Sequence, residues 1–85
     1  MSTLALKSVV ATEVVCSDVD INVTLSDGRS LSVPIVWFPR LANASTSERA
    51  DYELLGSGEG IHWPQLDEDI SVAGLLAGKH SVEFG

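Results

Sequence analysis

Residues 21–33 read INVTLSDGRSLSV, two runs of alternating apolar and polar side chains joined by a turn sequence. Such alternation is typical of a β-strand with one face in the core, and Asp-Gly is a strong hairpin signal. A two-residue loop would place apolar residues opposite polar ones along the whole ladder. A three-residue loop at residues 26–28, with Gly28 in the left-handed conformation, instead pairs Val23 with Leu31. The sequence therefore predicts an antiparallel hairpin with a bulged three-residue turn.

The second strand of this hairpin leads into a proline. We expect the strand to begin at Arg29 and to lie at the edge of its sheet, because Pro34 cannot donate a hydrogen bond to a ladder. β-branched residues or period-two alternation predict further strands at residues 9–16, 52–55 and 60–63. The last two are predicted to pair as a second hairpin, with Ile61 and Trp63 on one face and His62 on the other.

Helix-start signals stand at three places. Pro39 suits a first helical turn, Ser45 and Glu48 have the spacing of a capping box, and Ser71 is an N-cap residue ahead of an apolar run that ends at Gly78. The predicted helices are one that begins at Pro39, one from residue 46 to residue 51 or 52, and one over residues 72–77. We expect the core to include Trp37, Phe38, Leu41, Ala50, Ile61, Trp63, Leu66, Ile70, Leu75 and Leu76.

These elements predict a single domain, residues 1–85, of the α+β class. It would hold a small, mainly antiparallel sheet of about four to six short strands, with two or three short helices. Val82 and Phe84 alternate well enough to add a short terminal strand.

Twelve acidic and five basic side chains give the chain a net charge of −7. Direct nucleic-acid binding is disfavoured, because neutralising phosphates requires cations. The charge suits a small, basic protein partner, and it also serves simply to keep a small protein soluble. Cys16 is the single cysteine, which excludes a disulfide framework within the chain and fits a reducing compartment. No apolar run approaches the length of a membrane span, so we expect a cytoplasmic protein with no membrane contact.

Residues 60–71 read GIHWPQLDEDIS and form the strongest candidate for a site. His62 with Asp67 or Asp69 is a possible acid–base pair or part of a metal site. Neither an EF-hand spacing nor a nucleophile motif accompanies them, so the sequence assigns no catalytic residue, no metal ligand and no cofactor. The alternative is structural, with Asp67, Glu68 and Asp69 placed ahead of the last helix, where the helix dipole favours negative charge.

Aromatic and charged side chains in two segments are the candidates for contact with a partner. The candidates are Trp37, Phe38, Arg40, His62, Trp63, Gln65, Asp67, Glu68 and Asp69. Aromatic residues and arginine are the usual anchors of protein interfaces, although Trp37 and Trp63 are equally expected in the core.

Two longer signatures occur in the second half of the chain, WFPRL at residues 37–41 and GIHWPQLDEDIS at residues 60–71, with Ala44 and residues 47–49 between them. With these motifs, residues 37–78 resemble a family of small bacterial proteins, domain of unknown function 2442. The resemblance implies no established activity or cofactor. It implies a partner encoded beside the chain, in an arrangement similar to toxin and antitoxin pairs.

The leading functional hypothesis is therefore a non-enzymatic interaction module, an antitoxin-like neutraliser of a small cognate protein. One alternative is a small metal-dependent or acid–base enzyme that uses His62 with Asp67 or Asp69. The other is a homo-oligomeric adaptor.

Overall fold

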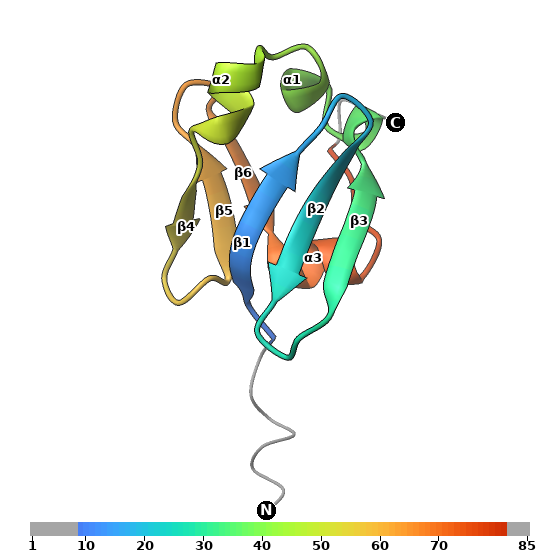
Figure 1. Ribbon diagram of the computed structural model, residues 1–85, viewed down its shortest axis with the longest axis vertical. Helices are drawn as coiled ribbons and strands as arrows, with labels where there is room; N and C mark the ends of the chain where they lie inside the picture. The colour runs from blue at the N-terminus through green and yellow to red at the C-terminus, as the bar shows by residue number, and fades with distance from the viewer. Residues whose placement is uncertain (1–8, 82–85) are drawn as a thin grey trace, which may run out of the picture.

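The protein is built from two three-stranded antiparallel sheets and three short α-helices (Figure 1). The computed structural model describes residues 9–81. The first sheet has the order β1-β2-β3 and the second has the order β4-β5-β6. The strands are β1 (Ala11–Cys16), β2 (Asp20–Leu25), β3 (Ser30–Pro34), β4 (Glu53–Leu55), β5 (Gly60–Trp63) and β6 (Glu68–Ser71).

This is an α+β fold, as predicted, but the expectation of one sheet is wrong. The strands divide between two sheets because residues 35–52, which follow β3, form helices and loops and do not turn directly into a pairing strand. The helical elements are the 3-10 helix η2 (Ile35–Trp37), α1 (Pro39–Ala42), α2 (Thr46–Ala50) and α3 (Val72–Leu76). In Figure 1, α1 and α2 lie at one end of the sheets, and α3 lies behind β2 and β3.

The first hairpin has the predicted register. Val23 pairs with Leu31 and Ile21 pairs with Val33. The N–H of Leu25 donates to the carbonyl oxygen of Arg29 at 2.8 Å, which closes a loop of residues 26–28, and Gly28 has a φ of 94°. β3 begins one residue later than predicted and ends at Pro34, at the border of its sheet. The alternation of apolar residues was sufficient to fix this pairing, because a slip of one residue would turn every apolar side chain outward.

Helix starts also follow the predicted signals. Pro39 is the first residue of α1, and Ser45 and Glu48 form a complete capping box at α2. The Ser71 hydroxyl accepts a hydrogen bond of 3.1 Å from the backbone N–H of Gly74. With at most five residues each, these helices depend on packing against the sheets for their stability.

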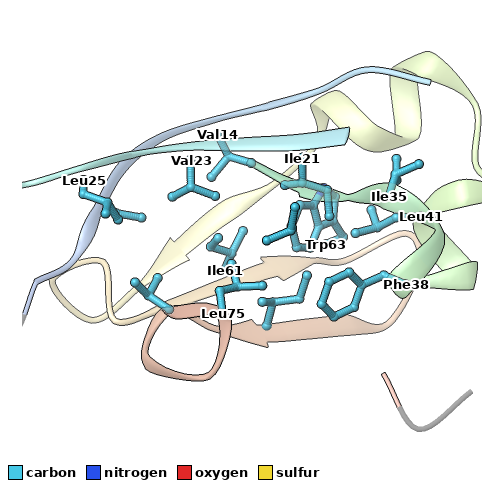
Figure 2. Packing of buried hydrophobic residues seen from close by; sticks show 14 residues of the cluster. Val14, Ile21, Val23, Leu25, Ile35, Phe38, Leu41, Ile61, Trp63 and Leu75 are labelled. Carbon is cyan, nitrogen blue, oxygen red and sulfur yellow. The ribbon is translucent and has the colours of Figure 1, made fainter. Parts of the chain in front are cut away.

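The core lies between the two sheets. Figure 2 shows Ile21 and Val23 of β2 above Ile61 and Trp63 of β5, with Phe38 and Leu75 beside them. Fourteen hydrophobic residues are buried: Ala11, Val14, Ile21, Val23, Leu25, Val33, Ile35, Phe38, Leu41, Ile61, Trp63, Ile70, Val72 and Leu75. Both sheets therefore contribute their inner faces to one core.

Some expected core positions are wrong. Ala50 is exposed and Arg49 beside it is buried, and Leu76 is exposed while Leu75 is buried. Helices of only five residues bury a narrow stripe, so one of two adjacent positions faces solvent. Trp37 and Leu66 are partly buried at the margin of the core. The predicted terminal strand at Val82 and Phe84 lies outside the described residues.

Arg49 ties the end of α1 to the first sheet. Its guanidinium donates to the carbonyl oxygens of Leu41 and Ala42, each at 2.9 Å, and to the Asp18 carboxylate at 2.7 Å. The carbonyl oxygen of Arg49 accepts a 3.0 Å hydrogen bond from the indole N–H of Trp63. This buried cation is therefore satisfied by fixed acceptors, which is the condition for burying an arginine.

Candidate functional site

The outer face of the second sheet carries a row of three titratable side chains. The strand register places Glu53 beside His62 and His62 beside Asp69. Ile61 and Trp63, on either side of His62 in β5, point into the core, so His62 points outward. A hydrogen bond joins His62 Nδ1 to Asp69 Oδ1. The sheet thus brings together the histidine and one of the two predicted carboxylate partners.

The carboxylates around His62 change its protonation. The hydrogen bond with Asp69 is the largest effect and raises the pKa of His62 above its usual value. Desolvation comes next and lowers it, and the negative charges of Asp69, Glu53 and Asp67 each raise it further. Asp67 contributes through its charge, and the hydrogen bond is made by Asp69. His62 therefore holds a proton to higher pH than an isolated histidine would.

A shallow depression lies next to this row. It has a volume of about 590 Å³, and its lining includes Leu55, Glu59, Gly60, Asp69 and Ser71. In the register, residue 60 stands between Leu55 and Ser71 on the outer face, and glycine at this position leaves the sheet surface open. The depression therefore has an apolar surface at Leu55 and Gly60, with the carboxylates of Glu59 and Asp69 beside it.

The turn before β6 is fixed from two sides. The guanidinium of Arg40 donates a 2.9 Å hydrogen bond to the carbonyl oxygen of Asp67, which has a φ of 52°. The side-chain amide of Gln65 donates to the Asp51 carboxylate at 2.8 Å. Through Arg40, the two segments that sequence analysis proposed as contact regions lie next to each other.

Three predicted contact residues belong to the interior instead. Trp63 has no exposed surface, Phe38 is 5% exposed and Glu68 is 9% exposed. Of the three adjacent carboxylates proposed for partner contact, Glu68 is buried, because residues 68–71 form strand β6 and its alternation turns Glu68 inward and Asp69 outward. Trp37 is partly buried, and its ring packs edge-on against the ring of His80, with 5.9 Å between the ring centroids.

Sequence analysis did not identify Glu53, Asp51 or the depression at Gly60. The signal for Glu53 was present in the predicted pair of strands, because the register of that pair places residue 53 opposite residue 62. Asp51 and Gln65 meet only in the folded chain.

Metal-ligating side chains do not cluster in the part of the chain that the structure describes. Within residues 9–81, no group of three or more His, Cys, Asp and Glu side chains is placed to hold a metal ion. Among the helices of the same residues, none is long and apolar enough to cross a membrane.

Comparison with known families identifies the family of the chain. The model of the family described as protein of unknown function (DUF2442) matches residues 11–81. The chain belongs to the DUF2442 family. The match includes all ten described strands and helices, so the candidate site on the outer face of β4-β5-β6 is part of the DUF2442 region.

Two solved structures share the fold. A protein of unknown function from Rhodospirillum rubrum is 30% identical, with a TM-score of 0.76 over 91% of this chain and 95% of that one. An uncharacterized protein from Chromobacterium violaceum is 24% identical, with a TM-score of 0.71 over 85% of this chain and 68% of that one. No curated protein matches the chain. Neither the DUF2442 description nor these two structures names an enzymatic activity.

Proposed function

We propose that this DUF2442 chain is a non-enzymatic interaction module that binds and neutralises a small, basic cognate protein. The contact surface would be the acidic face, which we define as Glu53, Asp67 and Asp69 around His62. The proposal includes a cytoplasmic location, with the single cysteine kept reduced, and a partner encoded by a neighbouring gene, as the family resemblance implies.

The observation that carries the proposal is the row of Glu53, His62 and Asp69 on one sheet face. Carboxylates held side by side create a local negative potential, which speeds the approach of a cationic protein and disfavours an anionic one. The net charge of −7 extends this attraction beyond the contact itself. The hydrogen bond between His62 and Asp69 also holds these two side chains in place before binding, so little of their side-chain entropy is lost on contact.

The depression beside the row suits the shape of basic side chains. Lysine and arginine combine an aliphatic stem with a charged head. A stem can lie on Leu55 and Gly60, while the head reaches Asp69 or Glu59 at the margin. An acidic partner side chain would meet these carboxylates at close range and be repelled.

The test compares two double variants with the same loss of charge. Glu53→Gln with Asp67→Asn removes two carboxylates from the acidic face. Glu13→Gln with Asp20→Asn removes two from the first sheet. With the product of the neighbouring gene as partner, the first variant should associate at least about tenfold more slowly in low salt, whereas the second should slow association only slightly.

Equal effects of the two variants would show that only net charge matters and that the acidic face is not the contact surface. Failure of the two proteins to co-purify after co-expression, at any salt concentration, would contradict the neutraliser role itself. Far-UV circular dichroism should show the same fold for both variants, because all four side chains lie outside the buried set.

A second candidate function rests on the His62–Asp69 hydrogen bond. A carboxylate that orients a histidine is a common arrangement in acid–base catalysis. The metal-dependent form of this hypothesis predicts a rise in melting temperature with magnesium, calcium, manganese or zinc, because a ligand of the folded state stabilises it. An unchanged melting temperature with all four ions would remove that form.

A further inference from the structure

The two edge strands of the first sheet, β1 and β3, differ in whether their outward backbone groups bond to another segment. On the β1 side, the N–H of Ala11 donates to the carbonyl oxygen of Gly58 at 2.8 Å, and the N–H of Val14 donates to the Tyr52 hydroxyl at 3.1 Å. These bonds attach β1 to the second sheet. On the β3 side, no hydrogen bond joins the outward backbone groups of Ser30 or Ser32 to another segment within residues 9–81.

The register shows which groups of β3 face outward. Arg29 O and Ile35 N–H bond to the β2 side, at 2.8 Å and 3.0 Å, so odd-numbered residues direct their backbone toward β2. In an antiparallel ladder, the residues between them direct N–H and C=O to the other side. Ser30 and Ser32 therefore present two donors and two acceptors at the border, whereas Pro34 presents an acceptor alone.

The border also lies in the one long part of the chain without carboxylates. All twelve acidic side chains lie outside residues 28–47, which carry two arginines. A chain with a net charge of −7 repels a second copy wherever carboxylates face each other, and β3 itself carries no charged side chain. By contrast, β4 at the border of the second sheet has only three residues and carries Glu53.

We propose that β3 pairs with β3 of a second copy of this chain, in an antiparallel arrangement about a two-fold axis at Leu31. Two identical edges satisfy each other in such an arrangement, because each copy donates and accepts the same bonds. The surface is separate from the acidic face, which stays available in the dimer for the proposed basic partner.

Proline selects the register of this pairing. With the axis at Leu31, Ser30 faces Ser32 of the partner copy, and four backbone hydrogen bonds form without a donor from residue 34. With the axis at Ser32, four bonds also form, but Ser30 would face Pro34, whose ring would then point at the partner strand in place of an N–H. A groove of about 260 Å³, lined by Val19, Asp20 and Pro34, lies at the end of the β3 edge. The Ser17 hydroxyl donates a 3.1 Å hydrogen bond to the carboxylate of Asp20 in this groove.

The experiment compares two substitutions of Ser32 by sedimentation equilibrium. Both Ser32→Ala and Ser32→Pro remove the 2.7 Å hydrogen bond from the Asn22 side chain. Only Ser32→Pro removes the outward N–H, and this N–H has no bond within the sheet, so the monomer should fold. Over roughly a hundredfold range of concentration, the average mass of the wild type and of Ser32→Ala should rise from that of one chain toward that of two. Ser32→Pro should dimerise at least about tenfold more weakly.

A mass of one chain for the wild type at every concentration would overturn the proposal. So would a Ser32→Pro variant that dimerises as tightly as Ser32→Ala, because the dimer would then use another surface. If Ser32→Pro fails to fold, amide hydrogen exchange of the wild type decides the matter. Exchange at Ser30 and Ser32 should slow as the protein concentration rises, and concentration-independent exchange at both would contradict pairing at β3.

Discussion

The two sheets are alike on their inner faces and different on their outer faces. Inside, both contribute aliphatic and aromatic residues to one core. Outside, the first sheet carries mainly neutral polar side chains along β2 and β3, such as Asn22, Thr24, Ser30 and Ser32. The outer face of the second sheet carries Glu53, His62 and Asp69. The inner faces therefore account for the fold, and the outer faces are where the two sheets differ in what they can bind.

The largest expected effect is on the inner face that both sheets share. Trp63 is fully buried and its indole N–H is bonded to Arg49. Trp63→Ala should lower the free energy of unfolding by about 3–5 kcal/mol, because it leaves a large cavity in a small core. Trp63→Phe keeps most of the ring and should cost less. Urea denaturation measures both, and equal losses would show that the hydrogen bond, rather than the packing, dominates at this site.

The buried guanidinium should come next. Arg49→Met removes the donor for two carbonyl oxygens and should cost about 2–3 kcal/mol in chemical denaturation, because those acceptors are left without a partner. Asp18→Asn removes the exposed carboxylate that pairs with the Arg49 guanidinium and should lower the free energy of unfolding by less than about 1 kcal/mol. A larger loss for Asp18→Asn than for Arg49→Met would contradict the assignment of the stabilisation to the carbonyl contacts.

Gly58, at the junction between the two sheets, and Gly28, in the turn of the first hairpin, both have a positive φ. A Cβ at Gly58 would lie 2.2 Å from the carbonyl oxygen of Ala11, whereas a Cβ at Gly28 would meet nothing within 4 Å. Gly58→Ala should therefore destabilise by about 1–3 kcal/mol or more, from strain and a steric clash together. Gly28→Ala should cost about 1–2 kcal/mol from the backbone conformation alone. Thermal unfolding of both variants would show whether the junction is as tight as the structure indicates.

The smallest expected effect concerns pH. Because the pKa of His62 is raised in the folded state, its protonation stabilises the fold fully below the unfolded value of about 6.5, and this stabilisation is lost as the pH rises through the folded pKa. Asp69→Asn should lower the pKa of the His62 ring, measured by an NMR titration. An unchanged pKa of His62 in this variant would show that Asp69 is not the main cause of the raised pKa.

The sequence was informative where a local pattern had one structural solution. Period-two alternation and a glycine fixed the first hairpin, and the spacing of Ser45 and Glu48 fixed the start of α2. Strand β6 was missed because Glu68 and Asp69 are poor strand formers, and their acidity suggested a helix entrance instead. Pairing with β5 outweighs this local preference.

Burial of charged residues was not predictable from the sequence in the same way. Arg49 is buried only because three acceptors from α1 and the β1–β2 turn meet it, and nothing in the sequence near residue 49 signals their position. The division into two sheets was missed for a similar reason, since two predicted hairpins do not show whether they join into one sheet. Of the candidate site, the outward position of His62 was predicted, whereas its neighbour across β4 was not.

NMR mapping of the complex tests the central claim most directly. The ¹⁵N-labelled chain would be titrated with the unlabelled product of the neighbouring gene. The acidic-face account predicts that the largest shift changes occur at Glu53, His62 and Asp69, while Glu13 and Thr24 on the outer face of the first sheet stay unchanged. Changes concentrated on the first sheet, or no changes at saturating partner, would contradict the account.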